Sequence, residues 1–178
     1  MKIRIVKPEI RILGLDEGKR SAYKLRKSHI FGVIYRGGRW LDGVLKTSVE
    51  VDRTDVSREI VKLVKHSGHY GQIRVIMLGR IFFAGRNPVD PEYIFKKLKR
   101  PIMVLAEKRV SLEGLGELKS LRIHGNQHLR FYLYGLSKEE AEEILKVSIL
   151  SGQLPEPIRV ARLIASAFQS AYEKLQNL

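Results

Sequence analysis

The chain has 178 residues and no cysteine, so its length suits one domain with a buried core and its composition excludes disulfides, thiolate metal sites and cysteine nucleophiles. Lys and Arg number 33 against 19 Asp and Glu, and the resulting net charge of +14 favours a polyanionic partner, most often nucleic acid. No apolar run approaches the roughly 20 residues of a membrane span, and the N-terminus has no signal-peptide core, so we expect no membrane contact and a cytoplasmic location.

The excess of basic residues is concentrated in the first 39 positions, whereas the segment 137–143 is mostly acidic. A heat-adapted surface is the alternative interpretation, because the chain is rich in charge and poor in Asn. That alternative explains the amount of charge but not its sign. Nucleic-acid binding is therefore the favoured interpretation.

The first expected strand, Ile10 to Asp16, is an apolar run that stops at an acidic pair and a glycine, Asp16-Glu17-Gly18. This ending is open to two interpretations: a simple turn, or reactive carboxylates presented at a sheet edge. Ile30 to Tyr35 predicts a second strand, residues 36–39 a tight turn with two glycines, and the alternation from Leu41 to Val51 a third, half-buried strand. The chain therefore opens with an antiparallel three-strand meander.

Helical and strand patterns then alternate. Thr54 or Asp55 can cap a helix that ends near Gly68. The next expected elements are a central parallel strand at 73–78, a loop with Gly and Phe at 79–87, a helix from Asp90 to Lys99 with Pro91 at its first position, and a buried strand at 102–106.

The C-terminal part is predicted to be mostly helical. Residues 109–128 suggest a short helix around Leu112 to Leu121 and then a turn at Gly125-Asn126, and residues 131–134 suggest an edge strand. Further helices open at the capping box of residues 137–140 and at residues 155–157. This order predicts one α/β domain over residues 1–178, a mixed sheet with helices on its faces.

Carboxylates near strand ends are the main chemical signal, because no phosphate-binding loop, nucleophile elbow or histidine ligand spacing is present. Asp16, Glu17, Asp52 and Asp55 follow the first and third expected strands, and carboxylates at one sheet edge can hold Mg²⁺. Asp55 has a competing interpretation as a helix cap. The strand 73–78 is the natural donor of another carboxylate, but it is followed by Gly and Arg.

Four stretches together carry a resemblance to a known family: Leu13-Gly-Leu-Asp-Glu-Gly18, Trp40-Leu-Asp-Gly-Val-Leu45, His69-Tyr-Gly-Gln-Ile-Arg-Val-Ile-Met-Leu78 and Leu154-Pro-Glu-Pro-Ile-Arg-Val-Ala161. From about Lys7 to Ala165 the chain resembles an uncharacterised archaeal family, domain of unknown function ninety-nine. That family is in turn similar to endonuclease V. The resemblance implies a ribonuclease-H-like fold, with an antiparallel three-strand meander, parallel strands, and helices on both faces of the mixed sheet.

The resemblance also implies a site. Endonuclease V cuts DNA or RNA near deaminated purines with Mg²⁺ held by carboxylates. In this sequence, Asp16 matches the metal-binding Asp of the first strand, and Asp52 or Asp55 falls where the family has its catalytic Glu. Lys108, in the stretch Ala106-Glu-Lys108, matches a lysine near the site.

Two positions depart from the endonuclease V pattern. Gly79 stands where a second metal-binding Asp is expected, and Arg162 stands where the last helix would carry a His or an acidic residue facing the metal. The aromatic-proline wedge of endonuclease V is not visible in residues 36–53. A missing carboxylate removes a ligand and a neutralising charge together, and Arg80 and Arg162 would repel the metal while attracting phosphate.

Three hypotheses follow. The first is a nucleic-acid-binding protein on an endonuclease-V-like scaffold with a degraded Mg²⁺ site and weak or absent nuclease activity. The second is an active Mg²⁺-dependent endonuclease that recruits Glu17, Asp52 or Asp55, and the third is a non-enzymatic protein-interaction scaffold. The residues expected to contact nucleic acid are basic: Lys19, Arg20, Lys24, Arg26, Lys27, Arg36, Arg39, Arg80, Arg86 and Arg162.

Overall fold

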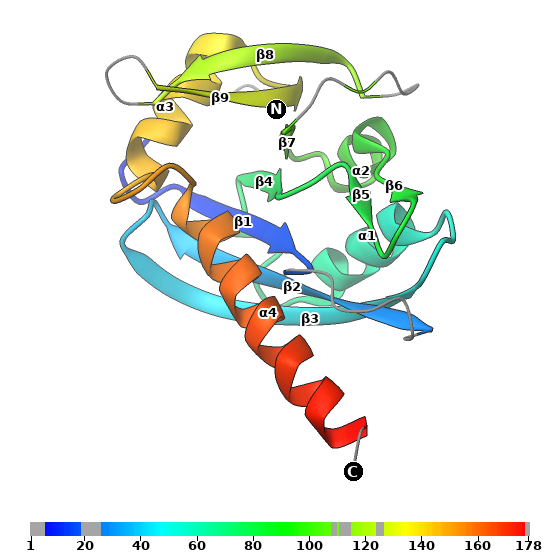
Figure 1. Cartoon of the computed structure of the whole chain (residues 1–178). Helices are drawn as coiled ribbons and strands as arrows, with labels where there is room; N and C mark the ends of the chain where they lie inside the picture. The colour runs from blue at the N-terminus through cyan, green and yellow to red at the C-terminus, as the bar shows by residue number, and fades with distance from the viewer. Residues whose placement is uncertain (1–5, 19–25, 108–109, 111–114, 124–126, 177–178) are drawn as a thin grey trace.

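The computed structural model describes residues 6–18, 26–107, 110, 115–123 and 127–176, and one mixed sheet of seven strands forms its centre (Figure 1). The strands lie in the order β3-β2-β1-β4-β7-β9-β8. Their bounds are β1 Arg11–Asp16, β2 Lys27–Arg36, β3 Trp40–Glu50, β4 Val75–Leu78, β7 Ile102–Leu105, β8 Glu117–Arg122 and β9 His128–Tyr134.

The sheet combines an antiparallel meander with a parallel centre. β1 pairs antiparallel with β2, and β2 pairs antiparallel with β3, which confirms the predicted three-strand opening. On its other side β1 runs parallel to β4, and β4 runs parallel to β7. Leu15 pairs with Leu78, so the carboxyl ends of β1 and β4 meet at one edge and bring Asp16 beside Gly79.

Helices cover both faces of the sheet, as predicted (Figure 1). Their bounds are α1 Val56–His66, α2 Pro91–Leu98, α3 Lys138–Ser148 and α4 Glu156–Gln176. Alternate residues of β1 pack on opposite faces of the sheet, because successive side chains of a strand point in opposite directions. Leu13 and Leu15 pack with α1 and α2, whereas Ile12 packs with α3 and with Ile158 of α4.

The prediction of a helix around Leu112 to Leu121 is wrong for the residues of that range that the structure describes as a strand. Residues 117–122 form β8, which pairs antiparallel with β9, so β9 is flanked by β7 and β8 and is not the edge strand. The apolar residues of the stretch Glu-Leu-Lys-Ser-Leu-Arg are compatible with a helix or with a strand, and pairing with β9 selects the strand. The expected start of that helix and the turn at Gly125-Asn126 lie outside the described residues.

Two further expectations change in detail. The predicted loop at 79–87 contains a small hairpin, β5 (Phe82–Phe83) paired antiparallel with β6 (Asn87–Pro88). Asp55 stands at the cap position of α1, but its side chain caps no backbone N–H. The Asn87 side chain does this instead: its Oδ1 accepts from the Val56 N–H at 3.2 Å, while its Nδ2 donates to Asp55 at 2.8 Å.

Helix α4 lies directly against the backbone of β1 because glycines leave room for it. A Cβ atom at Gly14 would lie 2.3 Å from the carbonyl carbon of Pro157 at the start of α4. A Cβ atom at Gly18, just after β1, would lie 2.6 Å from the backbone nitrogen of Ser166, one turn beyond Arg162. The close approach of α4 is what carries Arg162 over the end of β1.

We predict that Gly14→Ala destabilises the fold by about 1–3 kcal/mol or more, because the new methyl group meets backbone atoms of α4 that cannot rotate away. Thermal or urea unfolding measures the change. Gly71→Ala is the matched control, because a Cβ atom there meets nothing within 4 Å. Equal stability of the two variants would show that α4 does not depend on this contact.

Candidate functional site

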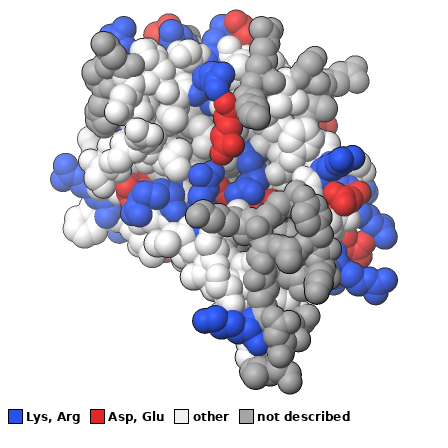
Figure 2. Space-filling view, in the orientation of Figure 1, with Lys and Arg blue, Asp and Glu red and all other residues white. Residues whose placement is uncertain are grey.

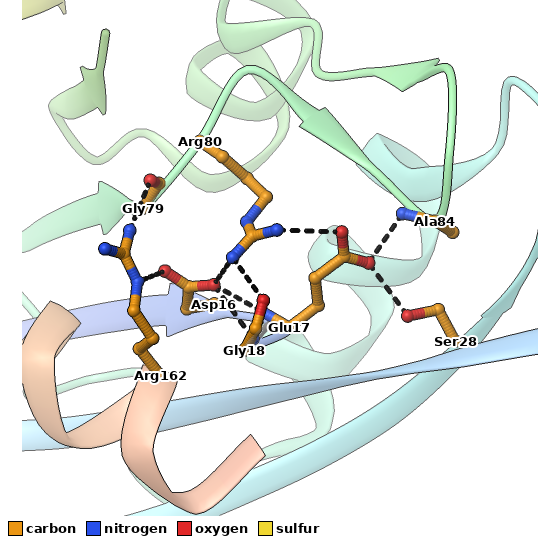
Figure 3. Close-up of polar contacts among 8 residues, drawn as sticks. All are labelled: Asp16, Glu17, Gly18, Ser28, Gly79, Arg80, Ala84 and Arg162. Carbon is orange, nitrogen blue, oxygen red and sulfur yellow. Dashed lines mark hydrogen bonds and ion pairs between the residues drawn. The ribbon is translucent and has the colours of Figure 1, made fainter. Parts of the chain in front are cut away.

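Asp16, the last residue of β1, is fully buried. Its Oδ1 accepts hydrogen bonds from the backbone N–H groups of Glu17 at 2.7 Å and Gly18 at 3.0 Å, and also from Arg80 Nη2. Its Oδ2 accepts from Arg162 Nε at 2.9 Å (Figure 3). Both carboxylate oxygens of Asp16 are therefore bound by guanidinium groups of the same chain.

Glu17 is the second buried carboxylate and makes a different set of contacts. Its Oε1 accepts from Arg80 Nη1 at 3.1 Å. Its Oε2 accepts from the Ser28 hydroxyl at 2.8 Å and from the Ala84 backbone N–H at 2.6 Å (Figure 3). Glu17 thus joins the end of β1 to β2 and to the β5–β6 hairpin.

The two arginines reach this place from different elements. Arg80 follows β4 and also donates to the Gly18 carbonyl at 2.6 Å, whereas Arg162 projects from α4 and donates to the Gly79 carbonyl at 3.2 Å. Their side chains are 24% and 28% exposed, while the Asp16 side chain is 0% exposed. Two positively charged guanidinium groups therefore cover two negatively charged buried carboxylates. This pairing offsets the free-energy cost of burying the charges.

Gly79 supplies no side chain to this cluster, and there is no room for one beside Asp16 as it stands. A Cβ atom at Gly79 would lie 2.2 Å from Asp16 Oδ2. Any larger residue at this position requires Asp16 to move.

The donor set does not fit the Mg²⁺ ion that the resemblance to endonuclease V implies. Mg²⁺ needs oxygen ligands in near-octahedral geometry, but both oxygens of Asp16 are engaged by arginines, and Gly79 has no side-chain oxygen and a carbonyl that already accepts from Arg162. Over the described ranges, no three His, Asp or Glu side chains are grouped closely enough to hold a metal ion.

Asp52 and Asp55, the other expected carboxylates, bind the β5–β6 hairpin. Asp52 Oδ1 accepts from the Arg86 N–H at 2.8 Å, and the Asp52 N–H donates to the Ala84 carbonyl at 2.8 Å. Asp55 accepts from Asn87. Among the described residues, neither carboxylate shares a hydrogen-bond partner with Asp16. Lys108 lies outside the described residues.

The expected nucleic-acid-binding residues fall into four groups, the last of which is Arg36 alone. Lys19, Arg20 and Lys24 lie outside the described residues, and Arg80 and Arg162 belong to the carboxylate cluster. The described and exposed ones are Arg26, Lys27, Arg39 and Arg86. Figure 2 shows Lys and Arg at the centre of one face and at its margins, with Asp and Glu between them.

Arg36 is held in a surface ion pair. Its Nε and that of Arg11 each donate to Asp42 at 2.8 Å. Burial alone would raise the pKa of the Asp42 carboxyl, but the hydrogen bonds from the two arginines outweigh it and hold this pKa below its ordinary value. Arg36 therefore stabilises the β2–β3 end of the sheet.

A cavity of about 820 Å³ opens beside the cluster, at the carboxyl ends of β1, β4 and β7. Its walls include four residues that the sequence analysis did not name as site residues, Phe82, Leu105, Glu107 and Val110. The only indication from the sequence that Phe82 could belong to a site was its place in a predicted loop rich in Gly and Phe, residues 79–87. Nothing in the local sequence indicated that Phe82 would line one cavity together with Glu17 and Gly18 at the end of β1.

Solved structures share this fold. A protein of unknown function from Archaeoglobus fulgidus matches with a TM-score of 0.75 at 28% identity, covering 89% of this chain and 97% of that one. Endonuclease V of Bacillus subtilis gives 0.67 at 12% identity, covering 95% and 85%. Endonuclease V of Ciona intestinalis, in complex with a 24mer DNA containing an inosine followed by a ribo-adenosine, gives 0.66 at 13% identity, covering 91% and 86%. The fold is ribonuclease-H-like, as expected from the resemblance.

Sequence relatives are archaeal. A UPF0215 protein of Methanothermobacter thermautotrophicus is 32% identical over 92% of this chain and 89% of its own length. A UPF0215 protein of Methanopyrus kandleri is 35% identical over 93% of this chain and 94% of its own. The family model for endonuclease dU matches residues 8–122 and 112–169. A match over most of the chain, with whole-length relatives in several archaea, shows that this protein belongs to the endonuclease dU family.

Proposed function

We propose that this protein binds nucleic acid and that its carboxylate cluster does not support efficient Mg²⁺-dependent cleavage. One observation carries the proposal: Arg80 and Arg162 occupy both oxygens of the buried Asp16. A cation such as Mg²⁺ would have to displace two guanidinium groups from a buried carboxylate before it could bind. Gly79 offers no second carboxylate to offset that cost.

Nucleic-acid binding is supported by charge and by kinship of fold. The net charge is +14, and exposed basic residues such as Arg26, Lys27, Arg39 and Arg86 are available for phosphate contacts. An endonuclease V with the same fold is bound to DNA. Contacts of this kind read backbone charge, so we expect little sequence preference.

An active endonuclease is the second candidate, and the family name is what favours it. The family is called endonuclease dU, and dU is the standard abbreviation of deoxyuridine. Such an enzyme would need to recruit Glu17, Asp52 or Asp55 as metal ligands. Glu17 is already bound by Arg80, Ser28 and Ala84, and Asp52 is bound by Arg86, so this candidate requires those contacts to open.

We predict that binding to labelled DNA or RNA falls by orders of magnitude between about 50 and 200 mM salt, because several phosphate contacts release counterions together. Fluorescence anisotropy across a salt series measures this. Arg26→Ala and Arg39→Ala should each reduce the slope, because both side chains are exposed. Salt-independent binding, or no binding at low salt, would favour an interaction scaffold instead.

We predict no retained Mg²⁺ or Mn²⁺ in calorimetric titration, and cleavage of deoxyuridine- or inosine-containing DNA and RNA that is absent or far below that of an endonuclease V. The double change Gly79→Asp with Arg162→His should raise metal affinity. Removing Arg162 frees Asp16 Oδ2, so that Asp16 can rotate away from the new side chain.

The control for this titration is Asp16→Ala in the double variant, which should abolish the gained affinity. If the unaltered protein binds the metal tightly and Asp16→Ala abolishes that binding, Asp16 belongs to a functional metal site. Efficient cleavage dependent on Asp16 would have the same meaning. Either result would replace the proposal with the active endonuclease.

A further inference from the structure

Large apolar side chains gather around the start of β3, at one end of the sheet. Trp40, Leu41 and Val44 are 59%, 51% and 46% exposed. Leu150, 50% exposed, lies beside the turn that precedes β3, since a Cβ atom at Gly38 would lie 3.1 Å from its Cγ. Single exposed apolar residues are ordinary, but a group of four at one place marks an interaction surface.

β3 also offers an open backbone edge. It is the end strand of the sheet and, with 11 residues, the longest, and among the residues that the structure describes it pairs with β2 alone (Figure 1). Proteins protect such an edge with proline, a bulge or an outward lysine. β3 has no proline, and the register shift lies between Ile34 and Tyr35 of β2. Its one lysine, Lys46, places its ammonium over the Phe168 ring of α4, 3.9 Å from the ring centre.

The position of Lys46 shows which face of β3 the exposed residues occupy. Lys46 lies on the side of the sheet on which α4 packs. Because strand side chains alternate, Trp40 and Val44 share that face with Lys46. A further strand paired with β3 would therefore cover Trp40 and Val44 beside α4.

The charges at the two ends of β3 indicate which partner fits. Residues 36–39, before the strand, contain two Arg and no acidic residue, whereas residues 50–55, at its end, contain three carboxylates and one Arg. A polyanion such as nucleic acid complements the basic end alone. A second copy of β3, running antiparallel, complements both ends: with a two-fold axis at Val44, the exposed Arg39 of each copy lies beside Glu50 of the other.

We propose that β3 pairs antiparallel with β3 of a second copy of this chain, around a two-fold axis at Val44, so that one continuous sheet runs through a dimer. The pairing supplies hydrogen-bond partners to the open backbone edge and buries Trp40 and Val44 of both copies. The inference is independent of the proposed nucleic-acid binding, because the cavity beside Asp16 is lined by other segments.

The first test follows association by sedimentation and by tryptophan fluorescence between about 1 and 100 µM protein, at about 500 mM salt, where assemblies bridged by nucleic acid dissociate. Trp40 is the only tryptophan of the chain, so its emission reports this surface alone. We expect a dimer at the higher concentrations, with Trp40 emission shifted to shorter wavelength as the ring leaves water.

Val44→Lys places two like charges on the two-fold axis and should weaken the dimer at least about tenfold. Leu175→Lys is the matched control, because it adds the same charge at an apolar residue that is exposed but lies near the end of α4. It should leave association unchanged. Thermal unfolding of both variants checks that the fold is intact.

A cross-link tests the register. The chain has no cysteine, and Val44 lies opposite its own copy, so Val44→Cys should form a disulfide between two chains under mild oxidation, which requires Cα atoms within about 7 Å. Ser48→Cys, exposed on the same strand, should not, because the two copies of residue 48 would lie roughly 27 Å apart.

Three results would overturn the inference. A chain that stays monomeric at every concentration leaves this edge to a different partner. Equal association of Val44→Lys and Leu175→Lys places any dimer contact elsewhere. Failure of Val44→Cys to cross-link, or equal cross-linking of Ser48→Cys, excludes the pairing at Val44. None of these results bears on nucleic-acid binding, which the salt series measures separately.

Discussion

A carboxylate with no exposed surface must be paired, and the pairing of Asp16 organises the centre of this molecule. Its partners come from three places: the turn that follows β1, the residue after Gly79 at the end of β4, and the second turn of α4. Leaving such a charge buried and unpaired would cost several kcal/mol, on the order of 3–5. The strand ends and α4 are thereby fixed relative to one another by electrostatics as well as by packing.

The approach of α4 to β1 makes this pairing geometrically available. Gly14 and Gly18 leave the helix resting on the strand backbone, and Arg162 lies between these two contacts. Arg162 Nε reaches Asp16, and its Nη2 reaches the Gly79 carbonyl. A bulkier β1 would hold the helix further out, and the guanidinium would lose both partners.

Much of the fold follows from sequence patterns, and the failures have physical causes. The alternation of residues 41–51, the capping box at Ser137 and the apolar runs at 73–78 and 102–106 each have one favoured structure and were predicted correctly. Residues 117–122 fit two periods, and only the partner strand β9 selects one. Local sequence alone cannot supply that information.

The candidate site was predictable only in part. The resemblance to endonuclease V directed attention to Asp16, Gly79 and Arg162, and these residues do lie together. Other features of the site depend on contacts between segments far apart in the chain. These are the hydrogen bonds of Glu17 and Asp52 to the β5–β6 hairpin and the exposure of Phe82. The cap of α1 also depends on a distant residue. Asn87, and not Asp55, accepts the hydrogen bond from the Val56 N–H at the start of this helix.

The anchoring of the hairpin has a consequence for local unfolding. Although β5 and β6 have two residues each, the segment bonds to Glu17 at the end of β1, to Asp52 after β3 and, through Asn87, to the first turn of α1. Opening it would uncover Phe83 and leave Glu17 short of a donor. Its amide protons should therefore exchange with solvent at rates close to those of the central sheet, and far more slowly than those of an ordinary surface loop.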